Sequence, residues 1–556
     1  MDTHRAFLAI VLSFVILVGY QYFFIGKSPE TPPPPTGTEE ETPPMPQPPV
    51  SQPAGETMPT GINQTAPPNN LSLPSPAKEG RDIVIDTKLF QAVITETGGG
   101  VKSFKLKEYK ETLEPDSQPV ELVKTDFFSE LPLYFTWGAE PARSEVPVYS
   151  ADRDSLRLAG LDREGSLTLK ANLSSGIDIT RKFVFDDKNY LIKLAIDIHN
   201  TSPQSIQGAP YLSLVNRPFT KSNSGSYLFS GPAVLIDDDL KEIKTSDLEK
   251  ETKTMRGRIV WTAYEGTYFM TGIIPEKKEN SIVRLQAVGD KISTLLSNDA
   301  DIIPSQGHKQ YNYTLFFGPK KLSILKQIDA DLQRIVNFGW FDILAKPTLV
   351  FLNFLYGFVK NYGVAIILVT VLIKVLFWPI AQKGMKSMKN MQKVQPKINK
   401  IREKYKNDPT RMNQEMMNLY KTYKINPLGG CLPMILQIPV FFALYKVLLQ
   451  AIELRHAPFM LWINDLSAPD RLWAGLNIPY LGGIPVLTLL MGGSMFLQQK
   501  MTPTPADPTQ AKIMLFLPVI FTFMFLNFAS GLVLYWFVNN LLSIGQQYMI
   551  NRPKEA

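Results

Sequence analysis

The sequence predicts a polytopic α-helical membrane protein that carries a large all-β domain outside the membrane. Three observations lead to this fold class. Long apolar segments lie at the N-terminus and through the last third of the chain. The polar region between them alternates apolar and polar residues as strands do. The net charge of +7 is concentrated largely in one loop of the last third. At 556 residues the chain is also too long for one compact core.

The first segment predicts a transmembrane anchor within residues 1–27. Phe7–Ile25 is an uninterrupted apolar run of 19 residues, longer than the apolar region of most signal peptides. No A-x-A cleavage site follows it, so an uncleaved anchor is preferred to a cleaved signal peptide. Residues 28–80 contain sixteen of the 44 prolines and few large apolar residues, a composition typical of a disordered tether.

Residues 81–318 predict a β-sandwich. Stretches such as RDIVIDTKLFQAVITETGGG, IDITRKFVF and YLIKLAIDIHN alternate β-branched or aromatic residues with polar ones. Gly, Asn and Asp turns separate these stretches. The domain is therefore predicted to be all-β.

Residues 319–363 predict a helical linker followed by a helix at the membrane interface. Leu322, Leu325, Ile328, Leu332 and Ile335 recur at helical spacing. The apolar run from Thr348 to Val359 has only a dozen residues. At 1.5 Å per residue it is too short to cross a hydrocarbon core of about 30 Å, so it is placed along the interface.

The last third predicts five more spans, which together with the anchor make six. The predicted helices occupy residues 364–380, 431–452, 484–501, 513–528 and 529–550, because an Asn527–Gly531 interruption divides the final apolar run into two crossings. Residues 453–483 and 502–512 are the loops between them, and residues 551–556 form a short tail.

The basic loop sets the topology. Residues 381–430 follow the second span, and between Ala381 and Asn426 there are twelve Lys or Arg against three Asp or Glu. Cytoplasmic loops carry such an excess, so this loop and both termini are predicted to be cytoplasmic. The β domain then lies on the other side of the membrane.

Several classes of function are disfavoured. The single cysteine and four scattered histidines give no ligand spacing for a metal site, and neither an esterase, a zinc-protease nor a P-loop motif occurs. No catalytic residue and no cofactor is therefore predicted. An ion-coupled carrier usually keeps a carboxylate at membrane depth, and none of the six predicted spans contains one.

Lys374 is the cation well inside a predicted span, whereas Lys446 lies near the outer end of its span and is expected to snorkel. A lysine at the centre of a bilayer helix costs about 2.5–3.5 kcal/mol, so it requires either a function or an escape route. It lies about 9 Å from the cytoplasmic end of its predicted helix, which leaves both an inward-facing polar site and snorkelling open. Thr370 shares its face at i, i+4, and Asn540 shares a face with Trp536. Neutral polar groups of this kind also form interhelical hydrogen bonds.

The basic loop predicts a helical hairpin with two contact stripes. Its methionines recur at helical spacing, as do its lysines. Asp408-Pro409 predicts the start of the second helix, and Pro396 is expected to kink or split the first. The methionines either pack the two helices together or offer an adaptable contact surface. The candidate contact residues are Lys383, Lys386, Lys389, Lys393, Met385, Met388, Met412 and Met416.

Three motifs together resemble the YidC/Oxa/Alb family of membrane protein insertases, in its Gram-negative type. They are QPKINKIREKYKNDPTRMNQEMMNLYKTYKINPLGGCLPMILQIPVFFALYKVL, then ELRHAPFMLWINDLSAPD, then PVIFTFMFLNFASGLVLYWFVNNLLSIGQQ. The specific resemblance covers about residues 340–550. It implies a β-supersandwich for the periplasmic domain, a five-helix core and multi-pass placement in the bacterial inner membrane.

The resemblance also implies a function and a site. The implied activity moves hydrophobic segments of nascent proteins from the cytoplasm into the membrane through a hydrophilic, positively charged groove, without enzymatic chemistry. Lys374 takes the place of an arginine common in relatives, and Trp536 that of a tyrosine. The implied groove residues are Lys374, Thr370, Gln437, Phe441, Tyr535 and Trp536, and Asn540 is added from its position on the last span.

Nascent membrane proteins, the Sec translocon, the ribosome and membrane lipids are the implied partners, with no specific small-molecule substrate. The tail after the last span is short, so ribosome contact is expected through the cytoplasmic loops. The alternative from a different class is an envelope scaffold whose β domain binds a glycan or a protein.

Overall fold

The computed structural model describes residues 80–551, with gaps at 126, 128–129, 142–143, 159–162, 220–227, 278, 329, 424–431, 474–480 and 503–507. The predicted anchor (1–27), the predicted tether (28–80) apart from Gly80, and the tail after Asn551 lie outside the described residues.

The predicted all-β domain is present as a succession of strands, most of which are joined by short turns. Alternate residues of β9 and β10 are buried, as the sequence pattern requires. The strands are β1 (Asp82–Asp86), β2 (Phe90–Thr95), β3 (Val101–Lys110), β4 (Pro119–Lys124), β5 (Phe135–Trp137), β6 (Ser150–Ala151), β7 (Ser155–Arg157), β8 (Glu164–Leu173), β9 (Ile177–Asp186), β10 (Leu191–Asn200), β11 (Ile206–Gly208), β12 (Pro210–Asn216), β13 (Gly231–Ile236), β14 (Asp239–Glu242), β15 (Lys253–Glu265), β16 (Phe269–Pro275), β17 (Asn280–Val288), β18 (Lys291–Asn298), β19 (Asp301–Ile303) and β20 (His308–Pro319), with the short helix α2 (Thr245–Leu248) after β14.

These strands form a small sheet, a large one, and a separate pair made by β11 and β19. The small sheet has the order β4-β3-β2-β1-β7, and the large sheet runs β5-β12-β18-β17-β15-β16-β20-β10-β9-β8-β6. The long strand β15 holds the large sheet together, because its first half pairs with β17 and its second half with β16. Phe104 of the small sheet packs on Phe317 of the large one, with ring centroids 5.2 Å apart.

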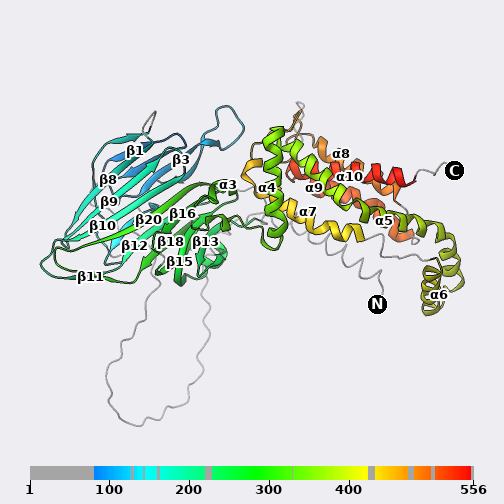
Figure 1. Cartoon of the computed structure of the whole chain (residues 1–556), viewed down its shortest axis with the longest axis horizontal. Helices are drawn as coiled ribbons and strands as arrows, with labels where there is room; N and C mark the ends of the chain where they lie inside the picture. The colour runs from blue at the N-terminus through cyan, green and yellow to red at the C-terminus, as the bar shows by residue number, and fades with distance from the viewer. Residues whose placement is uncertain are drawn as a thin grey trace, which may run out of the picture. The chain divides into compact units, whose positions relative to one another are not determined.

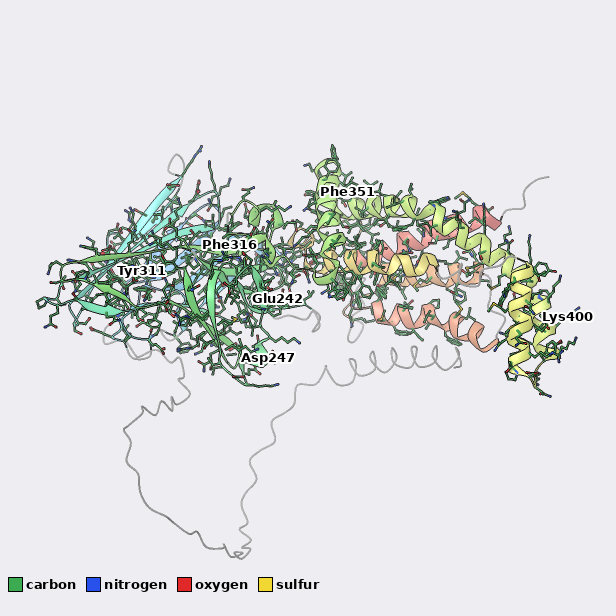
Figure 2. All side chains as sticks on the ribbon, turned by 60° about the horizontal axis from the view of Figure 1, so that its bottom comes forward. Glu242, Asp247, Tyr311, Phe316, Phe351 and Lys400 are labelled. Carbon is green, nitrogen blue, oxygen red and sulfur yellow. The ribbon has the colours of Figure 1, made fainter. Side chains whose placement is uncertain are left out.

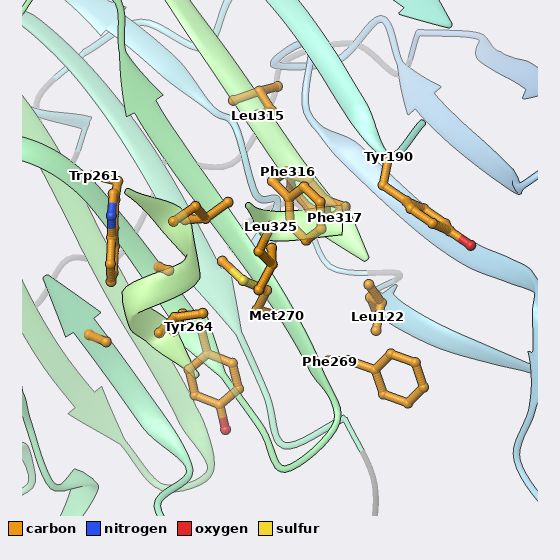
Figure 3. Close-up of a cluster of buried hydrophobic side chains, with 14 of the residues drawn as sticks. Leu122, Tyr190, Trp261, Tyr264, Phe269, Met270, Leu315, Phe316, Phe317 and Leu325 are labelled. Carbon is orange, nitrogen blue, oxygen red and sulfur yellow. The ribbon is translucent and has the colours of Figure 1, made fainter. Parts of the chain in front are cut away.

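The core of the domain is rich in aromatic side chains. Figure 3 shows Phe316 and Phe317 of β20, Phe269 and Met270 of β16, and Trp261 and Tyr264 of β15 in one buried cluster, together with Leu122, Tyr190, Leu315 and Leu325. Burial of this much apolar surface is the main source of the domain's stability.

Two histidines that are far apart in the sequence meet on the polar face of the large sheet. His199 and His308 are register partners on β10 and β20, and their rings stack with centroids 4.0 Å apart. Asp197 lies 3.0 Å from Nδ1 of His308. Among the described residues, no group of three or more potential metal ligands is gathered.

The predicted helical linker is present only as separate short turns. The segment after β20 forms only the short turns α3 (Leu322–Leu325), η3 (Leu332–Ile335) and η4 (Gly339–Phe341). Asp331 interrupts it with a left-handed backbone (φ 52°). Leu322, Leu325, Leu332 and Ile335 are nevertheless buried. Tertiary packing of each turn therefore overrides the helical periodicity of the segment.

The predicted interface helix is longer than the apolar run suggested. Helix α4 spans Asp342–Val359, and its first turns carry an Asp342–Lys346 ion pair at 2.7 Å. By length and composition Gly339–Val359 could cross a membrane, so the length argument against crossing does not hold for the whole helix. Figures 1 and 2 both show α4 running across the direction of α5.

The remaining helices follow the predicted spans closely. They are α5 (Tyr362–Lys404), α6 (Pro409–Thr422), α7 (Leu432–Gln450), α8 (Val486–Met501), α9 (Pro508–Phe525) and α10 (Ser530–Asn551), with the turn η6 (Ile452–Leu454) after α7. Helix α10 packs against α5 and α8, and α8 packs against α9 (Figure 1). In the described part of the chain, α5 is also long and apolar enough to cross a membrane. The apolar stretches Gln437–Gln450 and Met514–Phe525 are shorter. The count of six spans stays a prediction.

The predicted hairpin is present, but its first helix is not split. Helix α5 continues through Pro379 and Pro396 to Lys404, so no break separates the second predicted span from the hairpin. The residues on either side of Pro396, Val394 and Ile398, are buried against Met416 and other residues of α6, and this packing holds the helix together. As predicted, Asp408 caps α6 by accepting a hydrogen bond from the backbone N–H of Arg411 (3.0 Å).

Candidate functional site

Lys374 is turned toward α10. Its ammonium group donates to the hydroxyl of Ser543 at 2.6 Å and reaches the side-chain oxygen of Asn539 at 3.4 Å. The Ser543 hydroxyl in turn donates to the Asn539 carbonyl oxygen at 2.7 Å. No Asp or Glu of the described residues forms an ion pair with Lys374. The cation is thus held by neutral oxygens alone.

The depth of this contact distinguishes it from snorkelling. Helices α5 and α10 both begin at the end of the bundle where α4 and the 453–473 loop lie. Lys374 is twelve residues from the start of α5, about 18 Å, and Ser543 is thirteen residues from the start of α10, about 20 Å. The ammonium group therefore stays near the level of its own Cα instead of extending to a helix end.

Thr370 does not join this cluster through its hydroxyl. Its side chain is almost fully buried at 1% exposure and donates to the Ile366 carbonyl oxygen at 2.7 Å within α5. The residue lies one turn before Lys374, as predicted, and packs inside the bundle.

Phe441, Tyr535 and Trp536 come together in an aromatic cluster where α7, α9 and α10 meet. The ring of Phe441 lies edge-on to that of Trp536 at 4.7 Å and 6.5 Å from that of Tyr535. Phe525 of α9 completes the cluster 5.0 Å from Trp536. The side chain of Gln437, one turn before Phe441, faces the buried hydroxyl of Tyr535.

Asn540 makes a third contact of helix α10, this time with α8. Its side-chain amide donates to the hydroxyl of Ser494 on α8 at 3.1 Å, and it is buried. Helix α10 therefore takes part in three of the contacts made by the predicted site residues, on adjoining faces: a polar contact to α5, an aromatic contact to α7 and α9, and a polar contact to α8.

Sequence reasoning missed the roles of several polar residues on α10. Asn539 and Ser543 hold Lys374, although their side chains alone gave no reason to prefer them over Asn540. The side-chain amide of Gln546 reaches the Trp378 carbonyl oxygen at 3.4 Å, and that of Gln547 reaches the Met501 carbonyl oxygen at 2.6 Å. The repeated polar spacing from Asn539 to Gln547 was the available signal.

The loop between α7 and α8 is hydrogen-bonded to the two helices α8 and α10. The carboxylate of Asp470, which is 2% exposed, accepts from the Trp462 indole (2.6 Å) and from the backbone N–H of Thr488 (3.1 Å) near the start of α8. At the start of α10, the backbone N–H of Gly531 donates to Leu466 (2.9 Å). This loop covers the beginning of α10.

The four predicted contact lysines of the hairpin differ in their exposure to solvent. Lys383, Lys386 and Lys393 are exposed. Lys389 instead donates to the carbonyl oxygen of Ile550 at 2.8 Å and so ties the hairpin base to the end of α10. Figure 2 shows the hairpin at the end of α5, marked by Lys400.

The predicted methionines differ in the same way. Met416 packs in the small apolar cluster between α5 and α6, beside Val394 and Ile398. The other three lie partly exposed along the two helices, namely Met385, Met388 and Met412.

Comparison with known proteins gives a consistent result along the chain. A family model described as "YidC periplasmic domain" matches residues 82–351, and one described as "60Kd inner membrane protein" matches residues 354–556. The chain is 44% identical to "Membrane protein insertase YidC" of Syntrophus aciditrophicus (strain SB) over 557 residues, with 99% of each chain covered. It is 42% identical to the protein of that name from Geotalea uraniireducens (strain Rf4) over 564 residues, again with 99% of each covered.

Among solved structures, the crystal structure of an active YidC insertase with its first transmembrane domain resolved matches at 20% identity. It covers 86% of this chain and 94% of the solved chain, with a TM-score of 0.36. The crystal structure of YidC from Thermotoga maritima matches at 16% identity, covering 85% and 99%, with a TM-score of 0.30.

Proposed function

The chain belongs to the YidC family of membrane protein insertases, and from this premise we propose that its insertion path runs along the polar and aromatic faces of α10. As a member of this family the protein is an insertase and not an enzyme. It moves hydrophobic segments of newly made proteins into the membrane, and its β domain is the family's periplasmic domain.

The observation that supports the path is the environment of Lys374. A cation at this depth is costly unless water or polar groups surround it. Here its partners are the neutral side chains of Asn539 and Ser543, so its charge is not cancelled by a carboxylate of the described chain. A positive polar site within the bundle lowers the transfer cost of polar flanks, acidic ones above all, on an entering segment.

The aromatic cluster fits the next step. Phe441 and Trp536 are partly exposed where α7, α9 and α10 meet, and the buried ring of Phe525 packs behind Trp536, which gives an apolar surface there. An apolar client segment leaving the polar site can slide along this surface toward lipid. Chemical bond formation is not required, because the driving force is the burial of the client's apolar surface.

The hairpin is the proposed first contact for clients. Lys383, Lys386 and Lys393 are exposed, and Met385, Met388 and Met412 lie partly exposed beside them. This combination suits an amphipathic, unfolded segment and the anionic surface of a ribosome or a lipid leaflet. We place the hairpin and both termini in the cytoplasm on the basic charge of residues 381–426, and we propose that the chain works alone or beside the Sec translocon.

The test is insertion by the purified chain in liposomes. The client is a single-span protein with a short tail, and the readout is protease protection of the translocated tail. We expect Lys374→Ala to lower protection severalfold and Lys374→Arg to retain it, because the charge and not the shape of the cation is used.

Lys446→Ala is the matched control. It also removes one lysine from a helix, but this lysine lies near the C-terminal end of α7 and not in the Lys374 contact. If Lys374→Ala inserts as well as the unmodified chain, the charge has no role in the path, although family membership is unaffected. Equal losses from both alanine variants would point to a general effect of charge removal and would also contradict the proposal.

A further inference from the structure

The loop between α7 and α8 exposes two large apolar side chains at the tip of a tight turn. The turn is closed by hydrogen bonds from the backbone N–H of Phe459 to Ile463 (2.9 Å) and from that of Ile463 to Met460 (3.1 Å). At its tip Met460 is 50% exposed and Leu461 is 82% exposed. We call these two residues the apex.

The apex is held rigidly. The side chain of Asn361 donates to the Phe459 carbonyl oxygen at 2.8 Å, and the Trp462 indole is fixed by the buried Asp470. The ring of Phe459 lies so close to Gly363 that a Cβ there would come within 2.0 Å of it. Leu461 also adopts a left-handed backbone (φ 56°), which is unfavourable for leucine. The fold therefore presents this leucine at a cost in backbone energy.

The depth of the apex follows from helix α5. Asn361 is the N-cap of α5, and the last large apolar side chain exposed on the spanning part of this helix is Ile380. The twenty residues from 361 to 380 rise about 30 Å, the thickness of the hydrocarbon core. With Ile380 at the inner boundary, Asn361 and the turn bonded to it lie at the outer boundary.

The surroundings of the apex match lipid. Residues 457–463 contain no charge. Helix α4, joined to α5 through the hydrogen bond from the Tyr362 hydroxyl to the Asn353 side chain (3.1 Å), exposes further large apolar residues. These are Trp340, Ile343, Phe354 and Phe358, with exposed fractions from 57% to 99%. An exposed tryptophan beside large apolar side chains is typical of a membrane–water boundary.

We propose that Met460 and Leu461 insert into the outer leaflet of the lipid bilayer and anchor the α4–α5 junction there. The occupant of this surface is phospholipid acyl chain, and the anchor depends on α5 spanning the bilayer. By fixing the outer ends of the helices at one depth, the apex would hold the region through which a translocated client end leaves.

The experiment places a fluorescent label at single cysteines in proteoliposomes. The native cysteine is first removed by Cys431→Ser. An environment-sensitive label is then attached after Met460→Cys, Leu461→Cys, Asn464→Cys or Val375→Cys in separate chains. Asn464 is an exposed polar residue of the same loop, and Val375 is an exposed residue within the spanning part of α5. Quenching is compared between aqueous iodide and lipids that carry nitroxides at a shallow or a deep acyl position.

We expect labels at Met460 and Leu461 to be quenched severalfold more by the shallow nitroxide than the label at Asn464, and to be protected from iodide. The Val375 label should respond to the deep nitroxide, which checks the spanning of α5 independently of the apex. Met460→Cys leaves the left-handed residue unchanged, so its result stands even when Leu461→Cys disturbs the turn.

Three outcomes would overturn the anchor. Iodide access at the Met460 label would place the apex in water. Protection from both iodide and nitroxides would mean that protein, such as a second copy, covers it. Equal shallow quenching at Met460 and Asn464 would mean that the loop lies at the surface without inserting its apex.

Discussion

Glu265 is the residue whose environment most clearly predicts that the stability of the β domain depends on pH. It is 2% exposed at the end of β15 and pairs with Lys320, which also donates to the Gly266 carbonyl oxygen (3.2 Å). Burial raises the pKa of Glu265 from 4.5 to about 7, more than the lysine lowers it. One of its oxygens, Oε1, has no hydrogen-bond partner among the described residues.

This pKa predicts that the β domain loses stability as the pH rises. The folded state keeps the proton on Glu265 up to about pH 7, whereas the unfolded chain releases it near pH 4.5. Unfolding therefore releases a proton between these values, and stability falls by up to about 3 kcal/mol across this window and is level above it. Thermal unfolding of the purified chain between pH 4.5 and 8 measures this change.

Glu265→Gln should flatten the pH dependence, because glutamine does not titrate. Glu96 is the opposite case. The hydrogen bond from Arg81 lowers the pKa of Glu96 to about 2, so Glu96 stays charged between pH 4.5 and 7 and does not contribute to the change in stability there. An unchanged slope in Glu265→Gln would assign the pH dependence to other groups.

Lys374 also illustrates how one side chain acquires its role from a distant neighbour. Its spacing from Thr370 was readable, and both residues lie on α5 as expected. The hydroxyl of Thr370, however, bonds within its own helix, while Lys374 bonds to Ser543, 169 residues away. The partner of a cation depends on which helix packs beside it, and helical periodicity does not carry that information.

At the scale of elements, two adjacent glycines of α8 differ in what surrounds them. A Cβ at Gly492 would lie 2.1 Å from the hydroxyl oxygen and 3.1 Å from the Cβ of Thr522 on α9. A Cβ at Gly493 would meet nothing within 4 Å. Gly492 is thus the point where α8 and α9 approach closely.

Gly492→Ala should destabilise the α8–α9 contact, by about 1–3 kcal/mol, because the added methyl group forces the helices or Thr522 to move. Gly493→Ala should be neutral or slightly stabilising, since alanine favours helix. Thermal unfolding of the two variants in the same detergent compares them directly. Equal melting temperatures would mean that Thr522 makes room without cost.

In the hairpin, too, local signals were read correctly and distant contacts were not. Asp408-Pro409 predicted the start of α6 correctly, because capping depends on residues within one turn. Of the two effects expected of Pro396, a split does not occur, because α5 is continuous through it. The packing of Val394 and Ile398 against α6 compensates for the hydrogen bond that proline removes.

At the scale of the whole molecule, the proposed insertion path uses residues of the helices alone. The contacts of Lys374, Phe441, Trp536 and Asn540 are all made within residues 362–551. The β domain packs around Phe316 and Phe317, and none of the contacts just named involves a residue of this domain.

Deleting residues 81–318 should leave much of the insertion activity in place. The measurement is the same protease-protection assay in liposomes, with the shortened chain reconstituted at equal amount. Adding Lys374→Ala to the shortened chain should again lower protection, which shows that the retained activity uses the same path. A folded shortened chain without activity would assign the β domain an essential part and would favour the scaffold interpretation of this domain.

The sequence by itself determined the kinds of element and their order. Alternation marked the strands, apolar length marked the helices, and the three motifs of the last third identified the family. These signals are local, because strand and helix periods and caps depend on residues within a few positions of one another. They placed α7 to α10 within a few residues of their observed bounds, apart from the five-residue difference at the start of α9.

Only the tertiary structure decided which elements meet. It paired His199 with His308, divided the linker at Asp331, carried α5 through two prolines, and gave Lys374 its partners on α10. Each of these depends on contacts between residues far apart in the chain. Burial against a neighbouring element outweighs a local preference of about 1 kcal/mol, so the final arrangement follows from packing.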